Sequence, residues 1–95
     1  MSKKRFASVW DAIEDSARDS ASMQARADLM ITLQEHLRKR GVSQAQAAKL
    51  LQVTQPRISD LMRGKIDLFS SDTLIEMLGR LGARVKVSVD FRRAA

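Results

Sequence analysis

Apolar residues recur at helical spacing through most of this chain and predict five helices. Two of them lie close together between residues 43 and 64, separated only by a turn near residues 52–54. The other three are predicted at about residues 9–18, 23–40 and 71–81. Two short helices joined by such a turn form a helix-turn-helix, so the pattern predicts a mainly α fold built around this pair.

The two central helices have start signals of their own. Ser43, followed three residues later by Gln46, forms a capping box, and Thr54 is the expected N-cap of the second helix. Pro56 falls in the first turn of that helix, where its missing N–H group costs no hydrogen bond. Gly64 follows the last helical residue and ends the motif.

The second central helix presents a polar surface once its apolar stripe is buried. Ile58, Leu61 and Met62 are spaced to face a core. The outward positions offer hydrogen-bonding groups, among them Gln55, Pro56, Arg57, Ser59, Asp60 and Arg63. This composition suits base edges and phosphates in a DNA major groove. We expect Asp60 either to pair with Arg57 or Arg63 at i, i+3 spacing or to accept a hydrogen bond from cytosine.

The positive charge of the chain is concentrated on the same segment. The whole chain has a formal charge of +6, and residues 36–66 carry seven lysines and arginines against Asp60 alone. Residues 1–35 are slightly acidic. A cationic surface confined to one module is typical of a polyanion-binding site, and Lys65 is an expected phosphate contact.

These residues resemble the XRE (lambda repressor/Cro-like) helix-turn-helix family. The matching positions are Ser43-Gln44, Ala47-Ala48, Val53-Thr54-Gln55, Ile58-Ser59 and Arg63-Gly64. The flanks, residues 38–41, 67–70 and 73–74, are similar to the HigA-type antitoxin branch. Gln52 departs from the pattern, since many relatives have glycine at this left-handed turn position.

The resemblance implies a lambda-repressor-like arrangement of the five helices and binding of double-stranded DNA at a palindromic operator. It also implies that Gln44 contacts phosphate and braces Gln55. Gln55 suits adenine, and Arg57 or Arg63 suits guanine or phosphate. The expected DNA-binding residues are Ser43, Gln44, Thr54, Gln55, Pro56, Arg57, Ser59, Arg63 and Lys65.

The antitoxin branch implies a repressor of its own operon that neutralises a small ribonuclease toxin. The acidic N-terminal helix, with Asp11, Glu14, Asp15 and Asp19, would suit a basic toxin. A phage-type or general repressor would have the same motif without a toxin partner. A protein-interaction module is a further alternative. RNA binding is weakly supported, because none of the four aromatic residues lies on the predicted recognition face.

The chain changes period after residue 83, where apolar and polar residues alternate as in a half-buried β-strand. One strand needs a partner, so we expect antiparallel pairing with a second copy to give a homodimer; a strand of another protein is the alternative. The expected dimer contacts are Val85, Val87, Val89 and Phe91.

The predicted organisation has three parts. Residues 1–20 form an N-terminal arm and a short amphipathic helix, residues 21–83 the DNA-binding domain, and residues 84–95 the dimerisation strand and tail. A polar linker is expected at residues 19–22. Trp10 is expected to pack on the bundle, with an anchor for a partner protein as the alternative.

Composition excludes several other functions. Cysteine is absent and His36 is the only histidine, so we expect no metal site and no cofactor. The sequence has no spacing that brings a nucleophile, a base and an orienting residue together, and no glycine-rich phosphate loop, so an enzyme is not expected. No apolar run approaches the length of a membrane span, and we expect a cytoplasmic protein.

Overall fold

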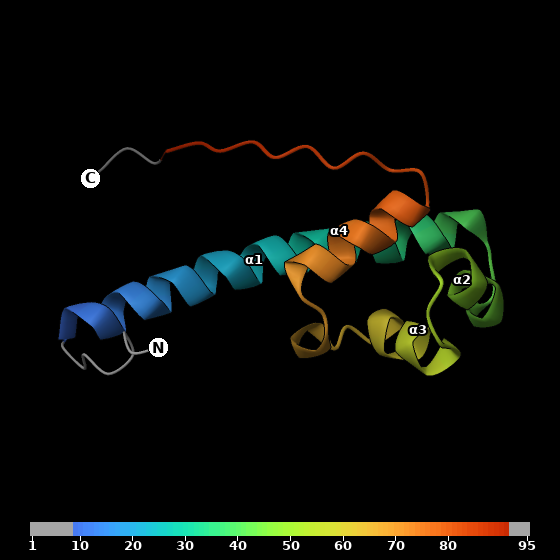
Figure 1. Ribbon diagram of the computed structural model, residues 1–95, viewed down its shortest axis with the longest axis horizontal. Coiled ribbons are helices and arrows are strands. Elements are labelled where there is room, and N and C mark those ends of the chain that lie inside the picture. Colours follow the sequence, from blue (N-terminus) through green and yellow to red (C-terminus); the bar gives the residue numbers. More distant parts are fainter. Residues whose placement is uncertain (1–8, 92–95) are drawn as a thin grey trace.

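The computed structural model describes residues 9–91, and for residues 9–19 it describes the backbone alone. A long first helix runs through the molecule, with two short helices at its C-terminal end and a fourth helix beside it (Figure 1). The elements are α1 (Val9–Arg40), α2 (Gln44–Leu51), α3 (Gln55–Met62), the 3-10 turn η2 (Ile66–Leu68) and α4 (Ser71–Arg80).

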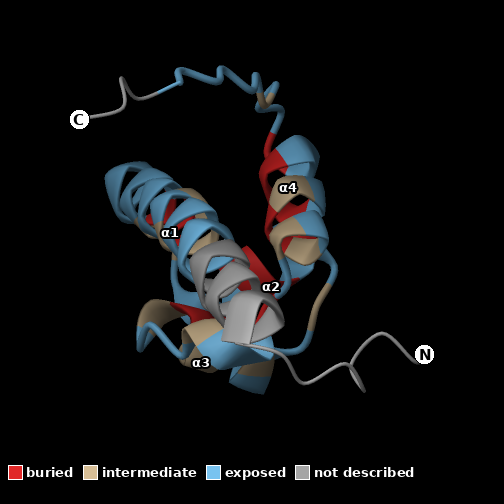
Figure 2. Ribbon diagram, turned by 90° about the vertical axis from the view of Figure 1, so that its left-hand side faces the viewer, coloured by how far each residue is buried: buried red, intermediate tan, exposed pale blue. Residues whose placement is uncertain are grey.

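The hydrophobic core forms where the C-terminal half of α1 meets α2, α3 and α4 (Figure 2). Burial of each large apolar side chain there stabilises the fold by about 1.5–3 kcal/mol. Side chains from every helix contribute, so no helix buries its apolar face alone. The most deeply buried are Leu33, Leu51, Ile58, Leu61, Phe69, Leu74 and Met77.

Side chains from neighbouring elements satisfy carbonyl groups at three helix C-termini. Gln34 Nε2 donates to the Leu61 carbonyl of α3 at 2.8 Å. Arg80 Nη1 donates to the Leu51 carbonyl of α2, and Arg40 Nη2 to the Leu81 carbonyl at the end of α4, both at 3.0 Å. The last carbonyls of a helix have no intrahelical partner and carry its negative dipole end, so these donors stabilise both the helices and their packing.

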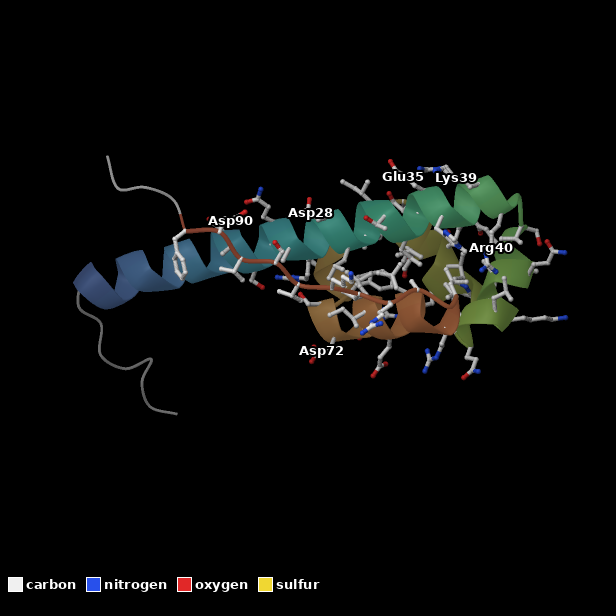
Figure 3. All side chains as sticks on the ribbon, turned by 90° about the horizontal axis from the view of Figure 1, so that it is seen from above. Asp28, Glu35, Lys39, Arg40, Asp72 and Asp90 are labelled. Carbon is white, nitrogen blue, oxygen red and sulfur yellow. The ribbon has the colours of Figure 1, made fainter. Side chains whose placement is uncertain are left out.

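The outer face of α1 is charged and points away from α4. Seen from above, the labelled side chains of Asp28, Glu35 and Lys39 leave α1 on the side opposite α4 (Figure 3). All three are exposed. The amphipathic pattern of α1 is therefore satisfied by burying a single face against the bundle.

The prediction of five helices is wrong, because residues 9–40 form one continuous helix. The predicted linker at residues 19–22 lies inside α1. It contains neither glycine nor proline, so nothing in it forces the backbone out of the helix, and Ser20 and Ser22 are exposed to solvent there. The expected arm at residues 1–8 and the side chain of Trp10 lie outside the described residues.

The prediction of a C-terminal β-strand is also wrong, since residues 83–91 have no regular secondary structure and the described chain contains no strand. Val85 packs against the core, but Val87, Val89 and Phe91 are 82%, 70% and 94% exposed. Alternating side chains do not supply the backbone partners that a strand requires, and residues 9–91 offer no strand edge for the segment 83–91 to pair with.

Candidate nucleic-acid interface

The predicted capping box at the start of α2 is confirmed. Ser43 Oγ accepts a hydrogen bond from the Gln46 amide at 3.1 Å, and Gln46 Oε1 accepts one from the Ser43 amide at 2.9 Å. Ser43 is therefore occupied in holding the helix terminus. Gln44, the first residue of α2, is exposed beside it, at the positive end of the helix dipole where a phosphate would be attracted.

The turn between α2 and α3 has the left-handed geometry that sequence reasoning assigned to Gln52. Its φ and ψ angles are 57° and 45°. The Gln52 amide donates to the Lys49 carbonyl and the Val53 amide to the Ala48 carbonyl, which is the hydrogen-bond pattern of a Schellman motif. These bonds hold a residue other than glycine in a conformation that costs it roughly 1–2 kcal/mol.

The start of α3 follows directly from that turn. Thr54 is its N-cap, as predicted, and its hydroxyl accepts a hydrogen bond from the Arg57 amide at 3.4 Å. Pro56 lies in the first turn. The first residue, Gln55, is exposed, so its side-chain amide faces solvent at the N-terminal end of α3.

The faces of α3 have three different environments. Ile58 and Leu61 are buried in the core. Arg57 and Asp60 point toward the segment that connects α3 to α4 and contact it there. Gln55, Ser59 and Arg63 recur every fourth residue and form a third stripe, which we call the reading stripe. Within residues 20–91, none of its three side chains has a hydrogen bond or an ion pair.

The sequence-based pairing of Asp60 with Arg57 or Arg63 is wrong. Asp60 Oδ1 lies 3.6 Å from Lys65 Nζ, and the Asp60 carbonyl accepts a hydrogen bond from the Lys65 amide at 3.1 Å. Lys65 reaches Asp60 because Gly64, with a φ angle of +75°, turns the chain back along α3. The only acidic side chain of α3 is therefore partly neutralised by the predicted phosphate-binding lysine.

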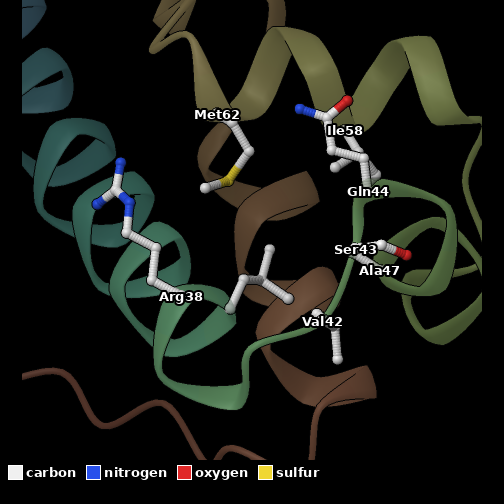
Figure 4. A pocket seen from close by; sticks show the side chains of 8 residues that line it. Arg38, Val42, Ser43, Gln44, Ala47, Ile58 and Met62 are labelled. Carbon is white, nitrogen blue, oxygen red and sulfur yellow. The ribbon is translucent and has the colours of Figure 1, made fainter.

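A hollow of about 140 Å³ lies between the end of α1 and the two motif helices. Arg38 of α1 and Gln44 of α2 flank it, and Ile58 and Met62 line its α3 side (Figure 4). Arg38 is exposed. One cation of the predicted basic segment thus lies across the hollow from Gln44, the expected phosphate contact (Figure 4).

Sequence reasoning missed the partners of several polar side chains. The sequence does not reveal that the Phe69 ring supports the Arg57 guanidinium, 12 residues earlier in the chain. The capping roles of Gln34 and Arg80 were missed too, because their acceptors lie 27 and 29 residues away along the chain. No local pattern reports such contacts.

Comparison with known proteins decides the family. A family model described as a helix-turn-helix domain matches residues 12–90. A solved structure assigned to the XRE family of transcriptional regulators is similar over 81% of this chain and 90% of its own, with 30% sequence identity and a TM-score of 0.74. This chain belongs to the XRE helix-turn-helix family. No curated protein matches it.

Membership of the XRE family makes this chain a DNA-binding transcriptional regulator with a helix-turn-helix domain. Among the described residues of this XRE protein, no helix is long and apolar enough to cross a membrane. Nor do three or more metal-ligating side chains gather anywhere in that part of the chain.

Proposed function

We propose that this XRE-family regulator is a sequence-specific repressor that reads its operator with the reading stripe of α3. The observation that carries the proposal is the division of α3 into three environments. Core packing occupies Ile58 and Leu61, and the connecting segment occupies Arg57 and Asp60. Gln55, Ser59 and Arg63 are left to meet base edges.

The chemistry of the reading stripe suits a major groove. The Gln55 amide offers a donor and an acceptor to adenine, the Arg63 guanidinium offers two donors to guanine or phosphate, and the Ser59 hydroxyl pairs with either kind of group. Around this stripe, Gln44 and Arg38 supply contacts to the phosphate backbone, which fix the position of the helix on DNA without reading sequence.

We propose further that the repressor binds a palindromic operator as a homodimer. Two copies of α3 are needed to read two half-sites, which lie roughly 34 Å apart in this class of motif. Residues 83–91 run on the side of the bundle opposite α3 (Figure 1), and within this segment Val87, Val89 and Phe91 expose apolar side chains. Covering these side chains in a dimer would leave both recognition helices accessible.

The decisive experiment measures binding of the purified protein to duplex DNA from upstream of its own coding region. A scrambled duplex of equal length is the control, and a salt series separates phosphate contacts from base reading. We expect the native duplex to bind more tightly at every salt concentration, with two protomers per site. Equal affinity for both duplexes would contradict sequence-specific repression.

Two matched variants assign the reading role. Gln55→Ala should weaken binding to the native duplex by about 1–3 kcal/mol, mostly through one base pair of each half-site. Gln24→Ala removes an equally exposed glutamine from α1, far from the motif, and should bind as the wild type does. A loss spread evenly over all DNA sequences would remove Gln55 from the reading stripe.

A second pair of variants tests the dimer proposal. Val87→Asp places a charge among the exposed apolar residues and should shift the protein from dimer to monomer in sedimentation velocity. Ser88→Asp adds the same charge at the neighbouring exposed residue and should remain dimeric. A dimeric Val87→Asp protein would show that the C-terminal segment does not hold the copies together.

The similarity to HigA-type antitoxins adds a partner to this proposal, a small ribonuclease toxin. The supporting observation is that α1 continues beyond the bundle (Figure 1), where residues 20–25 are all exposed and therefore accessible to a second protein. Co-expression with the product of the adjacent gene tests this. Relief of growth arrest would support it; arrest that persists would favour a repressor without a toxin.

A further inference from the structure

Arg57 differs from the reading stripe in having two partners inside the protein. Its Nη1 atom donates a hydrogen bond to the Leu68 carbonyl at 2.9 Å. Its guanidinium carbon lies 4.2 Å from the centroid of the Phe69 ring. Both partners belong to residues 64–69, the connecting loop that links α3 to α4.

These contacts leave Arg57 poorly placed to read a base. A guanidinium that recognises guanine needs two donors in one plane pointing at the base edge. In Arg57 one of those donors is bound to a carbonyl, and one face of the group is covered by an aromatic ring. Moving the guanidinium to DNA would break both interactions and leave the Leu68 carbonyl without this partner.

The Phe69 ring that lies under the Arg57 guanidinium is held rigidly. Phe69 is only 1% exposed, so the core fixes the ring on which the guanidinium lies. At the other end of the connecting loop, Lys65 is bound to Asp60 through both its ammonium group and its amide. Two neighbouring positions on one face of α3 therefore hold the two ends of the same loop.

We propose that Arg57 is a positioning residue, which fixes the connecting loop against α3 so that helix and loop meet DNA as one surface. The proposal rests on the proposed DNA-binding function and assigns Arg57 a role separate from base reading. Lys65 and Leu68 are exposed on this loop. Their distance from the reading stripe is set by the Arg57 contacts, and an unfixed loop would have to be ordered again each time DNA is bound.

The test compares the wild type, Arg57→Met and Arg57→Lys on the operator and on a complete set of single-base-pair variants of it. Methionine keeps the aliphatic stem over Phe69 but removes the donor and the charge. We expect Arg57→Met to weaken binding about tenfold, the effect of roughly one lost charge-assisted hydrogen bond, and by the same factor on every duplex. Lysine keeps the charge and should restore part of the affinity.

Hydrogen exchange of the free protein supplies a second readout. The amides of Lys65, Leu68 and Phe69 are hydrogen-bonded within the loop or to α3 and should exchange faster in Arg57→Met. Arg63→Met is the matched control: it removes an exposed arginine of the reading stripe, so it should alter DNA binding and leave loop exchange unchanged. Circular dichroism confirms that each variant is folded.

Two results would overturn the proposal. A loss confined to one base pair would make Arg57 a base-reading residue, and unchanged loop exchange in Arg57→Met would show that it does not hold the loop. Failure of the proposed function looks different, because the wild type itself would then bind native and scrambled duplexes equally. The hydrogen-exchange measurement needs no DNA, so in either case it shows whether Arg57 fixes the connecting loop against α3.

Discussion

The bundle differs from the two segments that flank it in how far its apolar side chains are buried. The bundle comprises residues 30–81, and the flanks are residues 20–29 and 83–91. In the bundle, most large apolar side chains are buried, with Ile31, Leu50 and Leu68 as exceptions, and helix C-termini receive donors from other elements. In the flanks, Met23, Val87, Val89 and Phe91 are exposed. Regularly spaced apolar side chains are thus buried only where a second element of the chain packs against them. Elsewhere they stay exposed and can be covered by another molecule.

The largest expected difference between the two regions is in core packing. Leu33→Ala removes a side chain with 0% exposure and should lower the free energy of unfolding by about 2–5 kcal/mol, through lost burial and the cavity that remains. Val89→Ala, in the C-terminal flank, should change the free energy of unfolding of the monomer by less than about 0.5 kcal/mol. Urea denaturation measures both. A large loss for Val89→Ala would mean that this flank packs on the bundle in solution.

A smaller difference is expected for two arginines. Arg80→Ala removes the donor to the Leu51 carbonyl at the C-terminus of α2 and should destabilise the protein by about 1 kcal/mol. Arg84→Ala removes an exposed arginine from the flank and should have almost no effect. Thermal unfolding followed by circular dichroism checks the pair, and equal shifts would show that the capping hydrogen bond adds no stability.

The smallest expected effect is a gain in stability from a substitution inside the bundle. Gln52→Gly relieves the strain of the left-handed backbone conformation in the motif turn, but it also raises the conformational entropy of the unfolded chain. We therefore expect a net stabilisation of about 0.5–1 kcal/mol. Gln52→Ala is the control, because alanine also disfavours this conformation and should give no gain. If both variants raise the melting temperature, the glutamine side chain rather than the backbone is the source of strain.

The same contrast explains what could be predicted from the sequence. Ser43, Thr54 and Gly64 act on their own neighbours, so local chemistry located α2 and α3 correctly. The predicted break at residues 19–22 and the predicted strand after residue 83 depended on what those segments would meet. Polarity alone did not end α1, and alternation alone did not make a strand.

The candidate site was predictable in outline and not in its contacts. The spacing of Ile58 and Leu61 showed which face of α3 is buried, and the remaining polar residues followed from it. From the sequence alone, Arg57 and Arg63 are equivalent candidates for contacts to guanine or phosphate. Only the folded chain distinguishes them, because Phe69 and Leu68 approach Arg57 through the turn at Gly64.

The unbroken course of α1 has a mechanical consequence. An α-helix rises 1.5 Å and turns about 100° per residue, so residues 9–25 place the first turn of α1 roughly 25 Å from the bundle. Inserting one residue near Ser22 would move that turn by only about 1.5 Å but rotate it by about 100° about the helix axis. A molecule bound at that turn would therefore face a direction, relative to the bundle, that is set by the number of residues in α1.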